Sequence, residues 1–301
     1  MENQQDALRR SESGFIEMLL RWAPRDGLNR TSIDGLEIFR RDDTIKVENR
    51  VCKPRASLIV QGAKRSVIGT EEYRFGGGYC LVCGVDMPGA SHITAATPDE
   101  PFLCVTINLD IEMFSKFASE IPESLLSKSR EGRGVSLARA EPEVFDAFFR
   151  LTSLLDRPER IAALTPLVMQ ELHYFLFAGP QGDFLRQLSL PRSNNNQIAQ
   201  AVSWIRNNFS EPLSVEDLAK RFNMSATSLN RHFKRVTTLS PLQYQKKLRL
   251  HEAQRLMISE CMDANGASLA VGYESPYQFN REYKRQFGLP PHQDVKARRH
   301  I

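Results

Sequence analysis

The chain of 301 residues contains no apolar run close to the roughly 18 residues that a membrane-spanning helix needs. It begins with the polar segment Met1-ENQQDALRRSES, which carries acidic residues early and lacks the basic region and apolar stretch of a secretory signal. Its five cysteines are an odd number, and without an export signal they indicate reduced thiols. These absences predict a cytoplasmic protein with no membrane partner.

Histidine is scarce where a metal site would need it. Residues 30–110 contain one histidine, His92, and no His-x-His pair, whereas a metal centre in a β-barrel needs clustered His and carboxylate ligands. No Ser-His-Asp order, Walker-type loop or dinucleotide fingerprint occurs, and the triple glycine at 76–78 is typical of a turn. The sequence therefore predicts no catalytic residue, no metal and no cofactor, and it favours a surface or pocket position for His92.

Cys80 and Cys83 are three residues apart in an apolar run. Side chains three apart in a strand point to opposite faces, so these thiols should not meet unless the strand ends or bulges between them. Buried small hydrophobic residues are the favoured interpretation, and a redox switch is the alternative.

One pattern occurs twice near the C-terminus. Residues 225–241 and 275–291 align at an offset of fifty, which indicates one supersecondary unit used twice. The unit is predicted to be a helix with a positive outer face. The identical positions are Ser225/Ser275, Asn230/Asn280, Arg231/Arg281, Lys234/Lys284, Arg235/Arg285, Leu239/Leu289 and Pro241/Pro291.

Charge is divided along the chain. Residues 193–301 hold 16 Lys and Arg against 9 Asp and Glu, a net of +7, whereas residues 1–192 hold 24 against 27, a net of −3. Such asymmetry suggests that the second part faces a polyanion, although a solvated basic face would explain the same surplus.

Residues 36–104 have the sequence pattern of an all-β domain. Apolar runs at 36–39, 57–61, 79–85 and 102–109 are separated by Gly, Pro and Asp, which predicts a small sandwich or barrel. Apolar residues then recur every three to four positions at 111–117, 144–155 and 164–176, so helices are expected there and in a short segment at 15–22. The polar run 191–196 is predicted to link an N-terminal domain, residues 1–190, to a C-terminal domain, residues 197–301.

The C-terminal part predicts two helix-turn-helix units. In the first, Ser214 begins a short helix, Asn223 suits a left-handed turn position and Ser225 caps the next helix. A connecting helix is expected from about residue 242 to 259, and its length of about 27 Å brings the two units close to one turn of B-DNA, about 34 Å. The second unit has a turn at 272–274, Ser275 as cap and Pro276 at the first helical position.

The outer faces of the repeated helices carry the residue types that read DNA. With Leu229 and Phe233 assigned to the core, the opposite face has short amide or hydroxyl donors and an arginine for base edges, followed by basic residues for phosphates. A solvated polar face is the simpler interpretation of one such helix, but the duplication favours DNA binding. The predicted DNA-binding residues are Thr227, Asn230, Arg231, Lys234, Arg235, Tyr277, Gln278, Asn280, Arg281, Lys284 and Arg285.

The C-terminal part resembles the tandem helix-turn-helix domain of the AraC/XylS family of transcription regulators. The resemblance lies in residues 218–236 (LAKRFNMSATSLNRHFKRV), 240–257 and 271–291 (VGYESPYQFNREYKRQFGLPP). The front half is similar to the N-terminal domain of one branch of that family, in residues 54–69, 79–88, 96–103 and 164–182. The resemblance implies an α+β fold, with an N-terminal cupin-like β-barrel, flanking helices and an all-α tandem helix-turn-helix domain. It also implies double-stranded DNA bound through the major groove, a small-molecule effector at the N-terminal domain, RNA polymerase as a partner and a homodimer formed through the N-terminal domain.

Three positions depart from the usual family pattern. Thr238 stands where glycine usually follows the first recognition helix, which predicts a strained or differently shaped turn. Small residues at 264–268 predict that the first helix of the second unit is the least stable of the set. Asp294 replaces an aromatic residue after the final proline and predicts a poorly anchored C-terminal tail.

The leading hypothesis is a sequence-specific DNA-binding transcription regulator, which is not an enzyme. The alternative is a cupin-type enzyme that binds a small molecule and uses its helical tail for interaction. Metal content and catalytic turnover would indicate the enzyme, and a salt-sensitive gel shift on a specific fragment would indicate the regulator. A constitutive nucleoid-type binder, with no preference among duplexes, is a third hypothesis.

Overall fold

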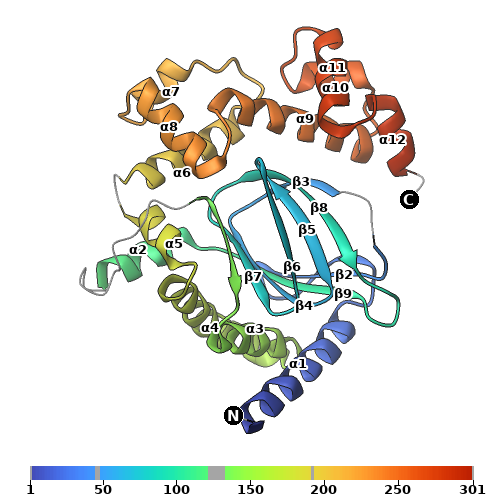
Figure 1. Cartoon of the computed structure of the whole chain (residues 1–301), viewed down its shortest axis with the longest axis vertical. Helices are drawn as coiled ribbons and strands as arrows, with labels where there is room; N and C mark the ends of the chain where they lie inside the picture. The colour runs from blue at the N-terminus through green and yellow to red at the C-terminus, as the bar shows by residue number, and fades with distance from the viewer. Residues whose placement is uncertain (1, 45–47, 121–132, 191–192, 300–301) are drawn as a thin grey trace.

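The computed structural model describes residues 2–44, 48–120, 133–190 and 193–299. Within these ranges, ten strands form two antiparallel sheets that face each other as a barrel, and helices cover both ends of it (Figure 1). The helices that follow the barrel form the C-terminal part of the molecule. This arrangement confirms the predicted α+β fold, with an N-terminal cupin-like barrel and a C-terminal helical domain.

The six-stranded sheet contains every strand that the sequence predicted. Its order is β1-β2-β9-β4-β7-β10, and the predicted runs form its four central strands. The five inner residues of β4 are all buried, and α1 packs against this strand. Because both faces of β4 are covered, its sequence is a nearly continuous apolar run. The strands are β1 (Gly27–Arg30), β2 (Leu36–Arg41), β9 (Phe102–Asn108), β4 (Arg55–Gln61), β7 (Tyr79–Cys83) and β10 (Val135–Arg139).

The four-stranded sheet was not predicted. Its order is β3-β8-β5-β6, and β5 alternates strictly between half-buried and buried residues. Because one face of this strand packs inward and the other carries polar side chains such as Arg65, no apolar run marks it in the sequence. The strands are β3 (Glu48–Cys52), β8 (Met87–Ala95), β5 (Ala63–Ile68) and β6 (Glu71–Gly76).

In the part of the chain that the structure describes, five helices flank the barrel. The predicted helical segments are confirmed as α1, α2, α3 and α4, although α1 is much longer than expected, and the ring of Phe15 on α1 contacts those of Phe145 and Phe149 on α3 at 5.4 and 5.5 Å. A 3-10 turn at Leu154–Asp156 joins α3 to α4. The helices are α1 (Glu2–Trp22), α2 (Ile111–Glu120), α3 (Pro142–Ser153), α4 (Pro158–Ala178) and α5 (Gly182–Ser189).

Helix α4 is long and apolar enough to cross a membrane, with a mean hydropathy of 1.3 over 18 residues. The sequence prediction counted only unbroken apolar runs, which Gln170 and Glu171 interrupt. Core helices of soluble proteins pass the same test, and α4 packs against α2, α3 and α5. Its side chains Leu164, Leu167 and Tyr174 are nevertheless exposed.

Between residues 193 and 299, seven helices make up the C-terminal part. Helix α6 begins at Asn194 with Ser193 as its cap, so residues 194–196 of the expected linker are its first turn, and residues 191–192 lie outside the described ranges. The side-chain amide of Asn195 donates a hydrogen bond of 2.7 Å to Gln187 of α5, which ties the two helices together. The helices are α6 (Asn194–Asn207), α7 (Val215–Arg221), α8 (Ala226–Thr237), α9 (Pro241–Ser259), α10 (Ala264–Ala270), α11 (Pro276–Phe287) and α12 (Pro291–Arg299).

Candidate nucleic-acid interface

The first helix-turn-helix consists of α7 and α8. The Ser214 hydroxyl accepts a hydrogen bond from the backbone N–H of Asp217, and the Ser225 hydroxyl accepts one from Ser228. Asn223 has a φ of 54°, the left-handed conformation that the turn needs. Leu229 and Phe233 are fully buried. The predicted caps, turn and core face are therefore confirmed.

The second helix-turn-helix consists of α10 and α11. Asp263 caps α10 through the N–H of Gly266, and Ser275 caps α11 through the N–H of Gln278, with Pro276 at the first position. The rings of Phe279, Tyr283 and Phe287 contact one another in sequence along one face of α11. As predicted, this face forms the core of the unit.

Arg249 of α9 joins the two units, and nothing in the sequence pattern marked it. Its guanidinium donates hydrogen bonds to the carbonyls of Phe209, Ser210 and Glu211 before the first unit, and to that of Gly272 in the turn of the second, at 2.6 to 3.0 Å. Gly272 has a φ of +84°, and an added Cβ would lie 2.0 Å from the Ser210 carbonyl oxygen. A glycine is therefore required where the two units meet.

A buried carboxylate holds α11 against α9. Glu282 accepts hydrogen bonds from Lys246 Nζ and the Tyr273 hydroxyl, both at 2.9 Å, and from Gln278 at 3.3 Å. Burial acts to raise the pKa of Glu282, but these hydrogen bonds outweigh it and hold the pKa below its ordinary value. The carboxylate thus stays charged and fixes the inner side of the second recognition helix.

The prediction of a poorly anchored tail at Asp294 is wrong. Asp294 is only 3% exposed and accepts hydrogen bonds from Gln254 at 2.5 Å, from the Tyr283 hydroxyl at 2.8 Å and from Arg298 at 2.9 Å. The Asp294 carboxylate accepts hydrogen bonds from three donors and so anchors α12 to α9 and α11. An aromatic residue at this position would anchor the helix by packing.

All eleven predicted DNA-binding residues are exposed. Those of the first copy lie on α8 and those of the second on α11, on the side away from the buried residues of each helix. Tyr277 is 78% exposed near the start of α11. The two helices stand at opposite ends of α9, which crosses the end of the barrel (Figure 1). The fold therefore presents two similar basic faces on one rigid support.

The barrel contacts the first unit at the end of α8. Thr238 has a φ of 63°, which confirms the strained turn expected there, and its hydroxyl accepts a 2.8 Å hydrogen bond from the backbone N–H of Thr70. The Val236 carbonyl accepts another from Gly134, and Lys247 of α9 donates to the Gly69 carbonyl at 2.9 Å. The first recognition helix is thus tied to the barrel.

A second contact is centred on Asp86, between β7 and β8. Its carboxylate accepts hydrogen bonds from Arg206 of α6 at 3.0 and 3.1 Å, and its carbonyl accepts one from the Tyr244 hydroxyl of α9 at 2.8 Å. Burial raises the pKa of Asp86, and Arg206 opposes that shift. Three segments, at residues 69–70, 84–86 and 134, therefore hold three helices of the C-terminal part.

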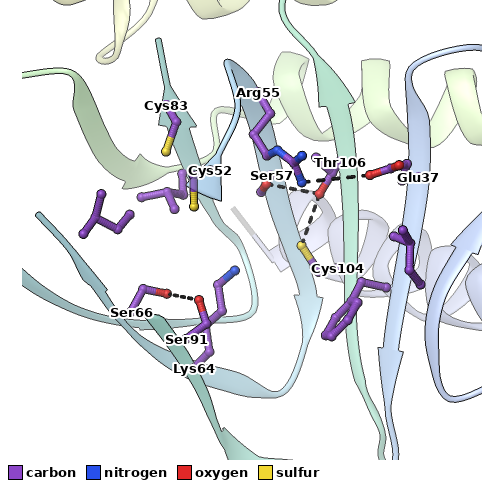
Figure 2. Close-up of a pocket in the computed structure, with 14 residues that line it drawn as sticks. Glu37, Cys52, Arg55, Ser57, Lys64, Ser66, Cys83, Ser91, Cys104 and Thr106 are labelled. Carbon is purple, nitrogen blue, oxygen red and sulfur yellow. Dashed lines mark hydrogen bonds and ion pairs between the residues drawn. The ribbon is translucent and has the colours of Figure 1, made fainter. Parts of the chain in front are cut away.

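The barrel encloses a polar cavity of about 30 Å³ (Figure 2). Arg55 and Lys64 supply positive charge, Glu37 lies 3.9 Å from Arg55, and Ser57 shares a 3.1 Å hydrogen bond with Thr106. This volume accommodates only one or two water molecules. His92, on β8, is half-buried and does not line the cavity.

Each of the five cysteines carries a thiol that is not in a disulfide. Cys83 lines the cavity with its neighbour Leu81, whereas Cys80 does not. The two side chains point to opposite faces of β7, as their spacing predicted. Cys80 is fully buried, and burial is the main cause that raises the pKa of its thiol to about 12. Cys80 therefore behaves as a small core residue.

The barrel and the two exposed basic helices define a class of protein, the helix-turn-helix transcription regulators with an N-terminal β-barrel domain. A family model of the AraC-type transcriptional regulator N-terminus matches residues 32–184, and a model of a helix-turn-helix domain matches residues 218–297. The chain belongs to the AraC/XylS family of transcription regulators.

Curated relatives are similar over parts of their length. The chain is 30% identical over 117 residues to the transcriptional activator RhaS of Escherichia fergusonii, covering 38% of this chain and 42% of RhaS. It is 26% identical over 176 residues to the transcriptional regulator YpdC of Escherichia coli, covering 56% of this chain and 57% of YpdC. The chain spans between 27% and 62% of the length of the curated relatives it matches.

Among solved structures, ToxT of Vibrio cholerae with a bound unsaturated fatty acid is similar in fold. The TM-score is 0.55 at 11% sequence identity, and the match covers 88% of this chain and 96% of ToxT. The order of barrel and helical domain is thus shared over nearly the whole chain.

Proposed function

We propose that the protein is a sequence-specific DNA-binding transcription regulator that inserts α8 and α11 into successive major grooves. The observation that carries this proposal is the pair of exposed faces with the same Asn-Arg and Lys-Arg positions, supported at the two ends of α9. At 19 residues α9 is about 28 Å long. That length suits helices separated by about 34 Å, one turn of B-DNA.

The eleven exposed residues divide by role. Arg231 and Arg281 bind guanine edges, and the side-chain amides of Asn230, Gln278 and Asn280 bind adenine edges. Thr227 and Tyr277, near the helix N-termini, contact bases or the backbone beside them. Lys234, Arg235, Lys284 and Arg285 lie one turn further along and bind phosphates.

A small-molecule effector is proposed to act at the N-terminal domain, which comprises residues 1–190. ToxT, whose fold is similar, has been crystallised with an unsaturated fatty acid. The cavity between Arg55 and Lys64 holds only one or two waters in this state, so a larger effector must displace side chains to enter. Contacts at Gly69, Thr70 and Asp86 then carry that displacement to α8 and α9.

Dimer formation through the N-terminal domain is part of the proposal, with a second copy as the occupant of the exposed apolar face of α4. Leu167 is 62% exposed and Tyr174 44% exposed on this helix. One dimer would then bind two half-sites on the DNA. It would act in the cytoplasm, where the DNA-bound dimer contacts RNA polymerase.

A gel shift with graded salt tests the proposal against the enzyme alternative. We expect binding to one specific duplex at low nanomolar to micromolar protein, and a steep loss of affinity as salt rises because released counterions drive the binding. Equal affinity for all duplexes would indicate a nucleoid-type binder instead. Metal content and turnover without DNA binding would indicate the enzyme.

A further inference from the structure

The fold brings the thiols of Cys52 and Cys83 together. Cys52 ends β3 and Cys83 ends β7, after which the chain turns through residues 84–86 into β8. Met87, the first residue of β8, is paired with Cys52. Both thiols line the barrel cavity, where Figure 2 shows their sulfur atoms on the same side.

The two cysteines differ in their exposure. Cys52 is half-buried on β3, the edge strand of its sheet, whereas Cys83 is 1% exposed. The hydrogen bond with Cys52, together with burial, raises the pKa of the Cys83 thiol, and the charges of Arg55 and Lys64 act against this. An oxidant therefore reaches Cys52 first, and Cys83 is placed to react in the second step.

We propose that Cys52 and Cys83 form a redox-modification site, at which a hydroperoxide converts the two thiols into a reversible disulfide. In the first step the Cys52 thiolate attacks hydrogen peroxide, an S–O bond forms, the O–O bond breaks, and the hydroxide released takes up the thiol proton as water. In the second step the sulfur of Cys83 attacks the Cys52 sulfenic acid and expels its oxygen as a second water. Two thiols and one peroxide thus give one disulfide and two waters.

Disulfide formation changes the surface that the barrel presents to α9. Neither thiol is in a disulfide, and a sulfur–sulfur bond of about 2.05 Å is shorter than any non-bonded contact between two sulfur atoms, so β3 must move toward β7. Val51 and Lys53, on either side of Cys52, line a groove of about 420 Å³ with Leu248 and His251 of α9. Asp86, which receives Arg206 and Tyr244, is three residues after Cys83. Oxidation therefore acts on β3, which contacts α9, and on β7, which leads into the turn that carries Asp86.

Peptide mapping of the full-length protein tests the proposal. The reduced protein is treated with hydrogen peroxide, its remaining thiols are alkylated, and trypsin releases residues 51–55, which contain Cys52, and residues 75–116, which contain Cys80, Cys83 and Cys104. We expect these two peptides to be joined, with fragmentation placing the bond at Cys83, and to separate on addition of dithiothreitol. The variants Cys80→Ser, Cys104→Ser and Cys261→Ser should form the same bond, whereas Cys83→Ser should leave Cys52 as a sulfenic acid that dimedone traps.

Three outcomes would overturn the site: an unmodified Cys52, a bond to Cys80 or Cys104, or a Cys52 oxidised to sulfinic acid beside an intact Cys83. They are read in the wild-type protein, so they do not depend on how the variants fold. Hydrogen exchange tests the coupling, with a rise of about threefold or more expected for residues 48–53 and 244–252 on oxidation. Unchanged exchange would refute the coupling. Neither readout uses DNA, so both are separate from the proposed function.

Discussion

The hydroxyl of Thr238 accepts a hydrogen bond of 2.8 Å from the backbone N–H of Thr70. Thr238 caps α8 with a φ of 63°, a conformation that glycine adopts at no steric cost. Glycine has no hydroxyl, however, and would leave this contact between the recognition helix and the barrel unmade. The threonine at this position is therefore explained by the interface, which offsets its backbone strain.

Replacing Thr238 tests this explanation. Thr238→Ala keeps the left-handed strain and removes the acceptor, so we expect the free energy of unfolding to fall by about 1 kcal/mol. Thr238→Gly also removes the acceptor but relieves about 1 kcal/mol of strain, and the greater flexibility of glycine in the unfolded chain cancels part of that relief, so its stability should lie between that of the alanine variant and that of the wild type. Urea unfolding measures both. A glycine variant less stable than the alanine variant would contradict the explanation.

Gly69 faces the same hydroxyl from the barrel side. An added Cβ would lie 2.0 Å from Thr238 Oγ1 and 2.6 Å from the Thr237 carbonyl oxygen, at a φ of +64°. We expect Gly69→Ala to cost about 2 kcal/mol or more, and Thr238→Gly to recover part of that cost by removing one of the two clashes. A double-mutant cycle by urea unfolding measures the recovery. Additive costs would show that the two residues do not meet.

Arg231 and Arg281 are predicted to read bases in separate grooves. Each change to alanine should weaken specific binding by about 1–3 kcal/mol and relax base preference in one half of the site only. Lys234→Ala is the matched control, because loss of a phosphate contact should weaken binding to all sequences alike and reduce the salt dependence. If both arginine variants gave wild-type footprints, the recognition helices would be wrongly assigned.

The Asp294 anchor predicts a large and specific loss of stability. Asp294→Ala removes the acceptor of the Tyr283 hydroxyl and the Gln254 amide, both buried. We expect a loss of about 2–4 kcal/mol in the free energy of unfolding, because two buried donors are left without partners. Asp294→Asn keeps one oxygen acceptor and should lose less. Equal losses in the two variants would mean that packing, not hydrogen bonding, anchors α12.

His251 predicts a contribution to acid sensitivity. Burial, and to a smaller extent Lys247, lower the pKa of His251 from 6.5 to about 4. Because the pKa of His251 is lower in the folded state, the unfolded state takes up a proton first as the pH falls below 6.5. The stability that neutral His251 contributes is therefore fully present above pH 6.5 and is lost as the pH falls toward 4, by about 3 kcal/mol in all. His251→Phe should keep the ring contact with Phe287 and remove this part of the pH dependence. Parallel stability curves for the variant and the wild type over this range would contradict the shift.

How far the sequence predicts the fold depends on how each element is buried. The strands predicted from apolar runs are the four central strands of the six-stranded sheet. The strands of the other sheet, such as β5 with Lys64 and Arg65, alternate between faces and carry charge, so apolar runs do not mark them. The helix caps were predictable because Ser225 and Ser275 act on residues only three positions away.

The contacts that join distant parts of the chain could not be predicted. Arg249 reaches four carbonyls on two separate segments, and Cys52 meets Cys83 only because β3 pairs with β8. Neither relation leaves a pattern at short spacing. Asp294 was misjudged for the same reason, because its donors Gln254 and Tyr283 come from other helices.

Selection of bound sequences from random duplex DNA tests the central claim most directly. The account predicts enrichment of a half-site motif with two short blocks of specified bases, their centres about 10 base pairs apart, one block lost with Arg231→Ala and the other with Arg281→Ala. Enrichment of a single block that neither change affects, or of no sequence at all, would contradict it.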